Sequence, residues 1–113
     1  MSRQWETWMT RGDDQDPQGH PLIVFSNDEA CSDANRTSLN VLFGSTKRPA
    51  IANRPFEIVC DEADGFEKPT VIDCSRIYFI FKGKLGHRLG SVSQMRRVQA
   101  CRKIAEVFRL VFR

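Results

Sequence analysis

The feature that most constrains this chain is a series of short strand-like segments separated by polar, turn-rich stretches. The segments are rich in β-branched and aromatic residues, and each is too short for a typical helix. The stretches between them contain the Gly, Pro, Asn and Asp residues that favour turns. The predicted strands are Gln4–Thr10, Pro21–Ser26, Ser38–Ser45, Phe56–Cys60, Thr70–Cys74 and Ile77–Phe81, the last two being either separate or one strand bent at residues 75–76.

The stretches between the predicted strands differ in charge and composition. Arg11–Gly19 has turn residues throughout and no apolar anchor, so we expect a mobile loop. Asn27–Thr37 is polar and is predicted to be a loop. Thr46–Arg54 is a basic, proline-containing loop, and Asp61–Pro69 is an acidic turn.

The last part of the chain changes to a helical period. Ser93 is a good N-cap candidate, and apolar residues recur after it at steps of three and four. The predicted buried face consists of Met95, Val98, Cys101, Ala105, Phe108 and Val111. We therefore expect a mainly β protein, 1–113 forming one domain, in which a C-terminal helix over about 93–111 covers one side of a barrel or curled sheet.

Composition and cysteine usage favour a cytoplasmic protein. No apolar run approaches the roughly 20 residues that span a bilayer, and the N-terminus lacks the apolar core of a signal peptide. The four cysteines form no CxxC pair, which argues against a zinc knuckle. Two disulfides are one alternative, but Cys60, Cys74 and Cys101 lie in apolar-patterned segments, so we favour reduced, structural thiols.

Charge is distributed unevenly along the chain. Residues 1–75 hold 7 basic and 13 acidic residues, a net of −6, whereas residues 76–113 hold 10 basic residues and one acid, a net of +9. Such asymmetry favours a basic surface for a polyanion or an acidic partner. A well-solvated basic helix explains the same charges equally well.

Six segments resemble, in order, the motifs of a known family. They are Gly19–Ser26 (GHPLIVFS), Val41–Thr46 (VLFGST), Pro55–Val59 (PFEIV), Asp64–Ile72 (DGFEKPTVI), Cys74–Tyr78 (CSRIY) and Lys84–Ser93 (KLGHRLGSVS). Each motif is loose, but their succession over roughly residues 3–110 resembles the MazF/PemK family of bacterial toxins.

The resemblance implies a fold, an activity and partners. The implied fold is a small SH3-like antiparallel β-barrel of the CcdB/MazF/PemK type, assembled as a homodimer. The implied activity is cleavage of single-stranded RNA, in which the 2′-hydroxyl attacks the adjacent phosphate. The reaction leaves a 2′,3′-cyclic phosphate and needs no metal or other cofactor. The implied partners are the RNA and a cognate antitoxin protein.

Two residues are the catalytic candidates on this alignment. His20 stands where the family has an Arg before the strand's Pro, and imidazole can give or take a proton near neutral pH. The exchange removes a bidentate phosphate clamp, and a loop histidine without a role is the alternative. Ser45 keeps the hydroxyl that holds the phosphate in the family, although a serine at a strand end is common.

The predicted RNA-binding residues fall into two groups. Thr46, Lys47 and Arg48 follow Ser45 and suit a backbone-plus-cation grip on phosphate; a solvated basic loop is the alternative. Arg76 could supply the charge of a family Arg that is Tyr78 here, and Tyr78 could stack on a base or be half-buried in the sheet. Ser75 replaces a usual acidic residue.

These departures keep other hypotheses open. A non-catalytic SH3-like module that binds RNA or protein would show binding without cleavage. A poison of DNA topoisomerase, the mode of CcdB, is disfavoured because that mode relies on a C-terminal Trp and this chain ends in Arg113. We expect His87 to be a surface-loop residue, and Trp5 and Trp8 to anchor the barrel or a dimer interface.

Overall fold

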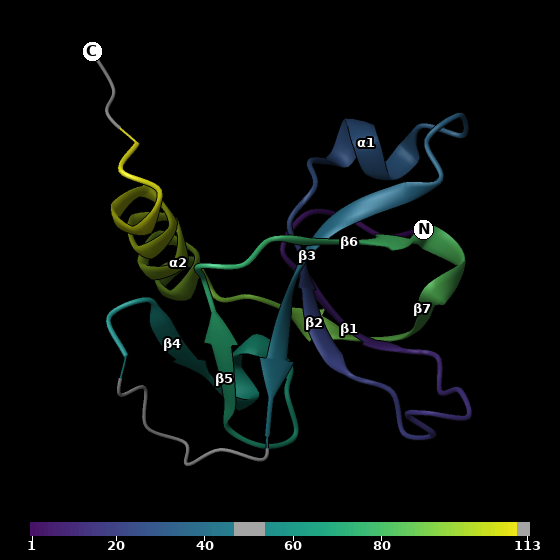
Figure 1. Ribbon diagram of the computed structural model, residues 1–113, viewed down its shortest axis with the longest axis horizontal. Coiled ribbons are helices and arrows are strands. Elements are labelled where there is room, and N and C mark those ends of the chain that lie inside the picture. Colours follow the sequence, from purple (N-terminus) through teal and green to yellow (C-terminus); the bar gives the residue numbers. More distant parts are fainter. Residues whose placement is uncertain (47–53, 111–113) are drawn as a thin grey trace.

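The computed structural model describes residues 1–46 and 54–110, which fold mainly into antiparallel β structure with a helix at the C-terminal end (Figure 1). The elements are β1 (Glu6–Thr10), β2 (Pro21–Val24), α1 (Asp28–Ser32), β3 (Ser38–Ser45), β4 (Glu57–Cys60), η1 (Glu62–Asp64), β5 (Thr70–Asp73), β6 (Tyr78–Phe81), η2 (Lys82–Lys84), β7 (Leu85–Ser91) and α2 (Gln94–Val107). All six predicted strand segments contain a strand, and 70–73 and 78–81 are separate strands.

The long strand β3 joins two parts of the sheet (Figure 1). Its first half pairs with β6, its middle with β2, and its last two residues, Gly44 and Ser45, with β5. The strand order is β4-β5-β3-β2-β1-β7, with β6 also paired to β3. Within residues 1–46 and 54–110 these pairings leave an open sheet. The predicted antiparallel sheet with a C-terminal helix is confirmed, whereas closure into a barrel is not.

Strand β2 is buried on both faces, as its continuous apolar run predicts. Ile23 belongs to a core cluster that lies under α2, whereas Leu22 and Val24 belong to a second cluster between β2, β3 and α1. Trp5 packs beside the first cluster and Trp8 beside the second, so both tryptophans are core anchors as predicted.

Helix α1 contradicts the prediction of a loop over Asn27–Thr37. The side chain of Asn27 accepts a hydrogen bond from the backbone N–H of Ala30 at 2.9 Å, which caps the helix. Cys31 is 4% exposed and belongs to the second core cluster. A one-turn helix has too few residues for a periodic pattern, so its formation depends on the cap and on this single buried side chain.

His87 is exposed as predicted, but it lies in strand β7 and not in the predicted loop. Residues 85–91 (LGHRLGS) show neither a continuous apolar run nor regular alternation, because two glycines interrupt them. They form a strand by pairing with β1, in which His87 lies opposite Met9, and the register shifts at two places. The partner strand, rather than local propensity, therefore determines this element.

Helix α2 begins after Ser93, as predicted, but it buries a different face and ends at Val107. Met95, Val98, Cys101 and Phe108, from the predicted buried stripe, are exposed. Ala100 and Ile104 are buried instead. No helix of residues 1–46 or 54–110 has the length and apolar character needed to cross a membrane.

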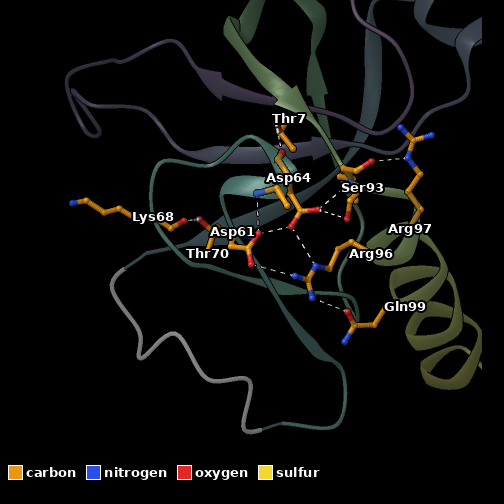
Figure 2. A network of polar contacts seen from close by, with 11 residues as sticks. Thr7, Asp61, Asp64, Lys68, Thr70, Ser93, Arg96, Arg97 and Gln99 are labelled. Atoms are coloured by element: carbon orange, nitrogen blue, oxygen red, sulfur yellow. Dashed lines mark hydrogen bonds and ion pairs between the residues drawn. The ribbon is translucent and has the colours of Figure 1, made fainter.

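A buried carboxylate, Asp64, explains the rotation of α2 (Figure 2). It accepts hydrogen bonds from the backbone N–H and the hydroxyl of Ser93, both at 3.0 Å, and from the backbone N–H of Asp61 at 3.0 Å. It also pairs with Nε of Arg96 at 3.2 Å. Arg96, Ala100 and Ile104 are spaced by four residues, so this pair turns the same row toward the core.

The ionisation of Asp64 follows from these contacts. Burial alone would raise the pKa of its carboxyl group, because it disfavours the charged form. The hydrogen bonds from Asp61 and Ser93 and the charge of Arg96 outweigh burial, so the pKa lies below its usual value. Ser93 thus serves the network with its hydroxyl rather than capping the helix with it.

The four cysteines are free thiols, as expected. Cys31, Cys60 and Cys74 are buried, and burial raises the pKa of the Cys74 thiol to about 12. Cys101 is exposed, which contradicts its predicted place on the packed face of the helix. The rotation of α2 described above is the reason.

Candidate active site

A pocket of about 520 Å³ opens where β2 begins and β3 ends, next to β6. Among the residues that line it are three of the predicted site residues, His20, Ser45 and Tyr78. They come from chain segments more than 20 residues apart, and the pairings of β3 with β2 and β6 bring them together. Thr46 lines a neighbouring hollow, which shares His20 and Ser45 with the pocket. Lys47 and Arg48 lie outside the described residues.

The backbone of His20 is fixed to the end of β1. Its N–H donates to Oγ1 of Thr10 at 2.8 Å, and its carbonyl accepts from the N–H of Thr10 at 2.9 Å. Gly19, just before it, has a φ of 76°, and a Cβ there would overlap the carbonyl oxygen of Thr10. Glycine is therefore required at this turn.

The imidazole of His20 lies between a carboxylate and an aromatic ring. Its Nδ1 contacts Oδ2 of Asp16, and its ring packs edge-on against Phe43 with centroids 6.2 Å apart. Just over half of the His20 side chain is exposed, at 54%. The Asp16 contact leaves Nε2 as the ring nitrogen that can exchange a proton with a bound substrate.

The loop that carries Asp16, which the sequence predicts to be mobile, makes hydrogen bonds within itself and an ion pair with Lys84. The carboxylate of Asp13 accepts from the backbone N–H groups of Gln15 and Asp16, at 3.0 and 2.7 Å. Its other oxygen pairs with Nζ of Lys84 at 2.8 Å. The hydrogen bond from Lys84 is the main cause that holds the pKa of the Asp13 carboxyl below its usual value.

Tyr78 lies on β6 directly opposite Val41 of β3, and its ring is beside Phe43, with centroids 5.1 Å apart and planes tilted by 60°. The residue is 40% exposed. His20, Phe43 and Tyr78 thus form a row of rings along the pocket. A partly exposed ring of this kind can stack on a nucleic-acid base, although the half-buried position also fits the alternative prediction.

Arg76 lies next to Tyr78 and is paired within its own turn. Its guanidinium donates to the hydroxyl of Tyr78 at 3.4 Å, and its Nε lies 3.7 Å from Oδ2 of Asp73. Asp73 lines the pocket and accepts hydrogen bonds from the backbone N–H and the hydroxyl of Ser75. A carboxylate therefore lies beside Ser75, the position at which the resemblance implies an acidic residue.

Sequence reasoning missed four charged residues that line this pocket: Asp16, Glu57, Asp73 and Lys84. Asp16 precedes His20 by four residues in a turn-rich segment, and only the fold of that segment shows that the two side chains meet. Within the part of the chain that the structure describes, no three His, Cys, Asp or Glu side chains are grouped so as to hold a metal ion.

Solved structures define the class of fold. The chain is similar to "Mycobacterium tuberculosis toxin MazF-mt6" at 17% identity and a TM-score of 0.75, over 95% of this chain and 99% of that one. It is also similar to "Endoribonuclease in complex with its cognate antitoxin from Mycobacterial species" at 15% identity and a TM-score of 0.78, over 100% of both chains. A mycobacterial endoribonuclease is 14% identical, with a TM-score of 0.76 over 99% of this chain and 95% of that one.

The sequence assigns the family itself. The model of the family described as "PemK-like, MazF-like toxin of type II toxin-antitoxin system" matches residues 4–108. The match spans most of the chain, so this protein belongs to that family. A comparison with curated protein sequences finds no significant match.

Proposed function

We propose that this toxin is an endoribonuclease that cleaves single-stranded RNA by attack of a 2′-hydroxyl on the adjacent phosphate, without a metal ion. Membership of the MazF-like family supports the reaction class. The observation that carries the proposal is the pocket, which His20, Ser45 and Tyr78 line together although they are distant in the sequence.

The proposed chemistry needs two proton transfers and donors for the phosphate. One group accepts the proton of the 2′-hydroxyl, and one gives a proton to the departing 5′-oxygen. Nε2 of His20 performs one of these transfers, because its other nitrogen faces Asp16. The hydroxyl of Ser45 holds a phosphoryl oxygen, and Thr46, Lys47, Arg48 and Arg76 bind the RNA backbone. Tyr78 stacks on a neighbouring base.

The test is cleavage of mixed-sequence single-stranded RNA in excess chelator, with the ends of the products mapped. We expect 2′,3′-cyclic phosphate and 5′-hydroxyl ends from the wild type, and losses of about 100-fold or more in His20→Ala and Ser45→Ala, the range of general acid–base catalysis. Ser32→Ala, at an exposed position of α1, is the matched control for Ser45→Ala and should cleave like the wild type. Cleavage that the chelator abolishes would contradict the metal-independent mechanism.

One observation favours a second function, a binding module that no longer cuts. Three basic side chains around the pocket already face a carboxylate: His20 faces Asp16, Lys84 faces Asp13 and Arg76 faces Asp73. These carboxylates reduce the positive charge offered to a phosphate. Intact RNA together with salt-sensitive binding in the same assay would favour this function.

We further propose a homodimer. The apolar side chains of Met95 and Val98 on α2, and of Phe108 directly after it, are exposed, and exposed apolar surface of this kind marks interaction sites. Light scattering on the purified protein should give twice the mass of 13.0 kDa, and Met95→Glu should shift it toward the monomer. A monomer at all concentrations would rule the dimer out.

We also propose that the protein acts in the cytoplasm with a cognate antitoxin. The net charge of +9 over residues 76–113 would complement an acidic segment of such a partner. Co-expression with the adjacent open reading frame should rescue growth and yield a complex. Absence of both rescue and co-purification would contradict this partner.

A further inference from the structure

We propose that Asp16 is the positioning residue of this site, and that its carboxylate fixes the tautomer and orientation of the His20 imidazole. The inference rests on the proposed function, in which His20 transfers a proton. It concerns a residue that lies outside the motif containing His20, in a segment whose composition suggested only a loop.

The first support is that Asp16 is itself held at several points. Its backbone N–H donates to Oδ1 of Asp13 at 2.7 Å, and its carbonyl accepts from the N–H groups of Asp13 and Gly19 at 3.0 and 3.1 Å. The Asp13–Lys84 pair and the hydrogen bond from the N–H of Arg11 to the carbonyl of Lys84, both at 2.8 Å, fix the turn to η2. The carboxylate of Asp16 is therefore presented from an ordered turn.

The second support is that His20 is held independently of Asp16. Two hydrogen bonds with Thr10 fix its backbone, and Phe43 packs against its ring. The backbone position of His20 thus does not require the carboxylate. What the carboxylate adds is a partner for Nδ1, which leaves Nε2 for the substrate.

The chemistry gives this contact a definite consequence. A neutral imidazole carries one proton, and a carboxylate at Nδ1 favours the tautomer with that proton on Nδ1. Nε2 then has the lone pair that accepts the 2′-hydroxyl proton, or, in imidazolium, carries the proton that goes to the departing oxygen. In both cases the N–H group at Nδ1 of His20 keeps its hydrogen bond to the carboxylate of Asp16. The same carboxylate stabilises the imidazolium.

The test compares four variants of one loop. Asp16→Asn keeps the shape but lets an amide N–H₂ donate to Nδ1, which favours the other tautomer; Asp16→Ala removes the partner. Asp16→Glu keeps the carboxylate and should restore part of the activity. Asp14→Asn is the matched control, because it changes the same charge in the same loop and Asp14 is exposed.

We expect kcat for RNA cleavage to fall about 10- to 1,000-fold in Asp16→Asn and Asp16→Ala, since loss of a partner that fixes a catalytic His tautomer costs up to about 10⁴ in kcat. KM should change by less than about threefold. Asp14→Asn should match the wild type in both constants. Equal kcat in Asp16→Asn and the wild type would overturn the proposal, whereas equal losses in Asp14→Asn would indicate only a general charge effect and overturn it too.

A spectroscopic measurement separates this proposal from the proposed function. In protein with ¹⁵N-labelled histidine, His20 signals are assigned by their loss in His20→Ala, and the ¹⁵N shifts report the tautomer. We expect the Nδ1–H tautomer in the wild type and in Asp14→Asn, and a shift toward Nε2–H in Asp16→Asn. If the wild type does not cleave RNA, the proposed function fails, and the tautomer alone decides whether Asp16 orients His20: an unchanged tautomer in Asp16→Asn would reject it.

Discussion

Two acidic side chains in this protein, Asp64 and Asp16, each face a basic side chain, and their surroundings differ. Asp64 is fully buried, and its partner Arg96 is 17% exposed at the side chain, with three further donors around the carboxylate (Figure 2). Asp16 and His20 are 37% and 54% exposed at a pocket. Desolvating a charge costs several kcal/mol unless it is fully hydrogen-bonded, so the buried pair determines the packing of α2. An exposed pair adds little stability and remains accessible to a ligand.

The largest expected effect is on the buried side of this comparison. Asp64→Asn removes the negative charge that pairs with Arg96. Removal of one partner of a buried ion pair lowers the free energy of unfolding by about 3–5 kcal/mol. We expect a loss of about 3 kcal/mol in the free energy of unfolding, measured by urea denaturation. Glu62→Gln, at an exposed position of η1, is the control and should stay within about 0.5 kcal/mol of the wild type. Equal stability of both variants would mean that the network does not hold α2.

The two faces of α2 give the next contrast. Ile104→Ala removes a buried side chain from the core cluster and should cost about 2–4 kcal/mol. Met95→Ala changes a residue that is 74% exposed and should cost less than about 0.5 kcal/mol in the monomer. Urea unfolding at low protein concentration measures both. A larger loss of stability in Met95→Ala than in Ile104→Ala would mean that α2 buries the face that the sequence pattern predicts.

Acid should reduce the difference in the free energy of unfolding between the wild type and Asp64→Asn. The pKa of Asp64 is lower in the folded protein than its unfolded value of about 3.9, so its contribution is fully present above that pH. The contribution is lost as pH falls through the lowered folded pKa. Unfolding free energies measured between pH 7 and pH 2 should therefore converge below about pH 4. A difference that is constant with pH would show that the charge of Asp64 is not the cause.

The smallest expected stability effect is on the exposed side. Asp13→Asn removes the exposed ion pair with Lys84 and leaves the buried apolar surface unchanged. The midpoint of urea unfolding should therefore equal that of the wild type within experimental error. Because Asp13 holds the turn that carries Asp16, the variant should still lose kcat in RNA cleavage. A large change in the midpoint together with unchanged cleavage would reverse the roles assigned to the two regions.

The sequence determined much of the β structure by itself. Ser38–Ser45 was predicted with the observed bounds, and the apolar run at Pro21 gave a strand buried on both faces, because β propensity and apolar patterning are local properties. It also ranked His20, Ser45 and Tyr78 as site residues, which the structure brings to one pocket. Their roles remain predictions.

Tertiary structure decided what local patterns do not encode. Strand β7 forms because β1 offers it hydrogen-bond partners, although its glycines give it little propensity. The rotation of α2 depends on the attraction of buried Asp64 for Arg96. Apolar periodicity does not predict this buried row, because its first residue is an arginine. The meeting of Asp16 with His20 likewise depends on a turn fixed by Lys84, 71 residues away from Asp13. In each case the deciding energy comes from a contact between segments that are distant in the chain.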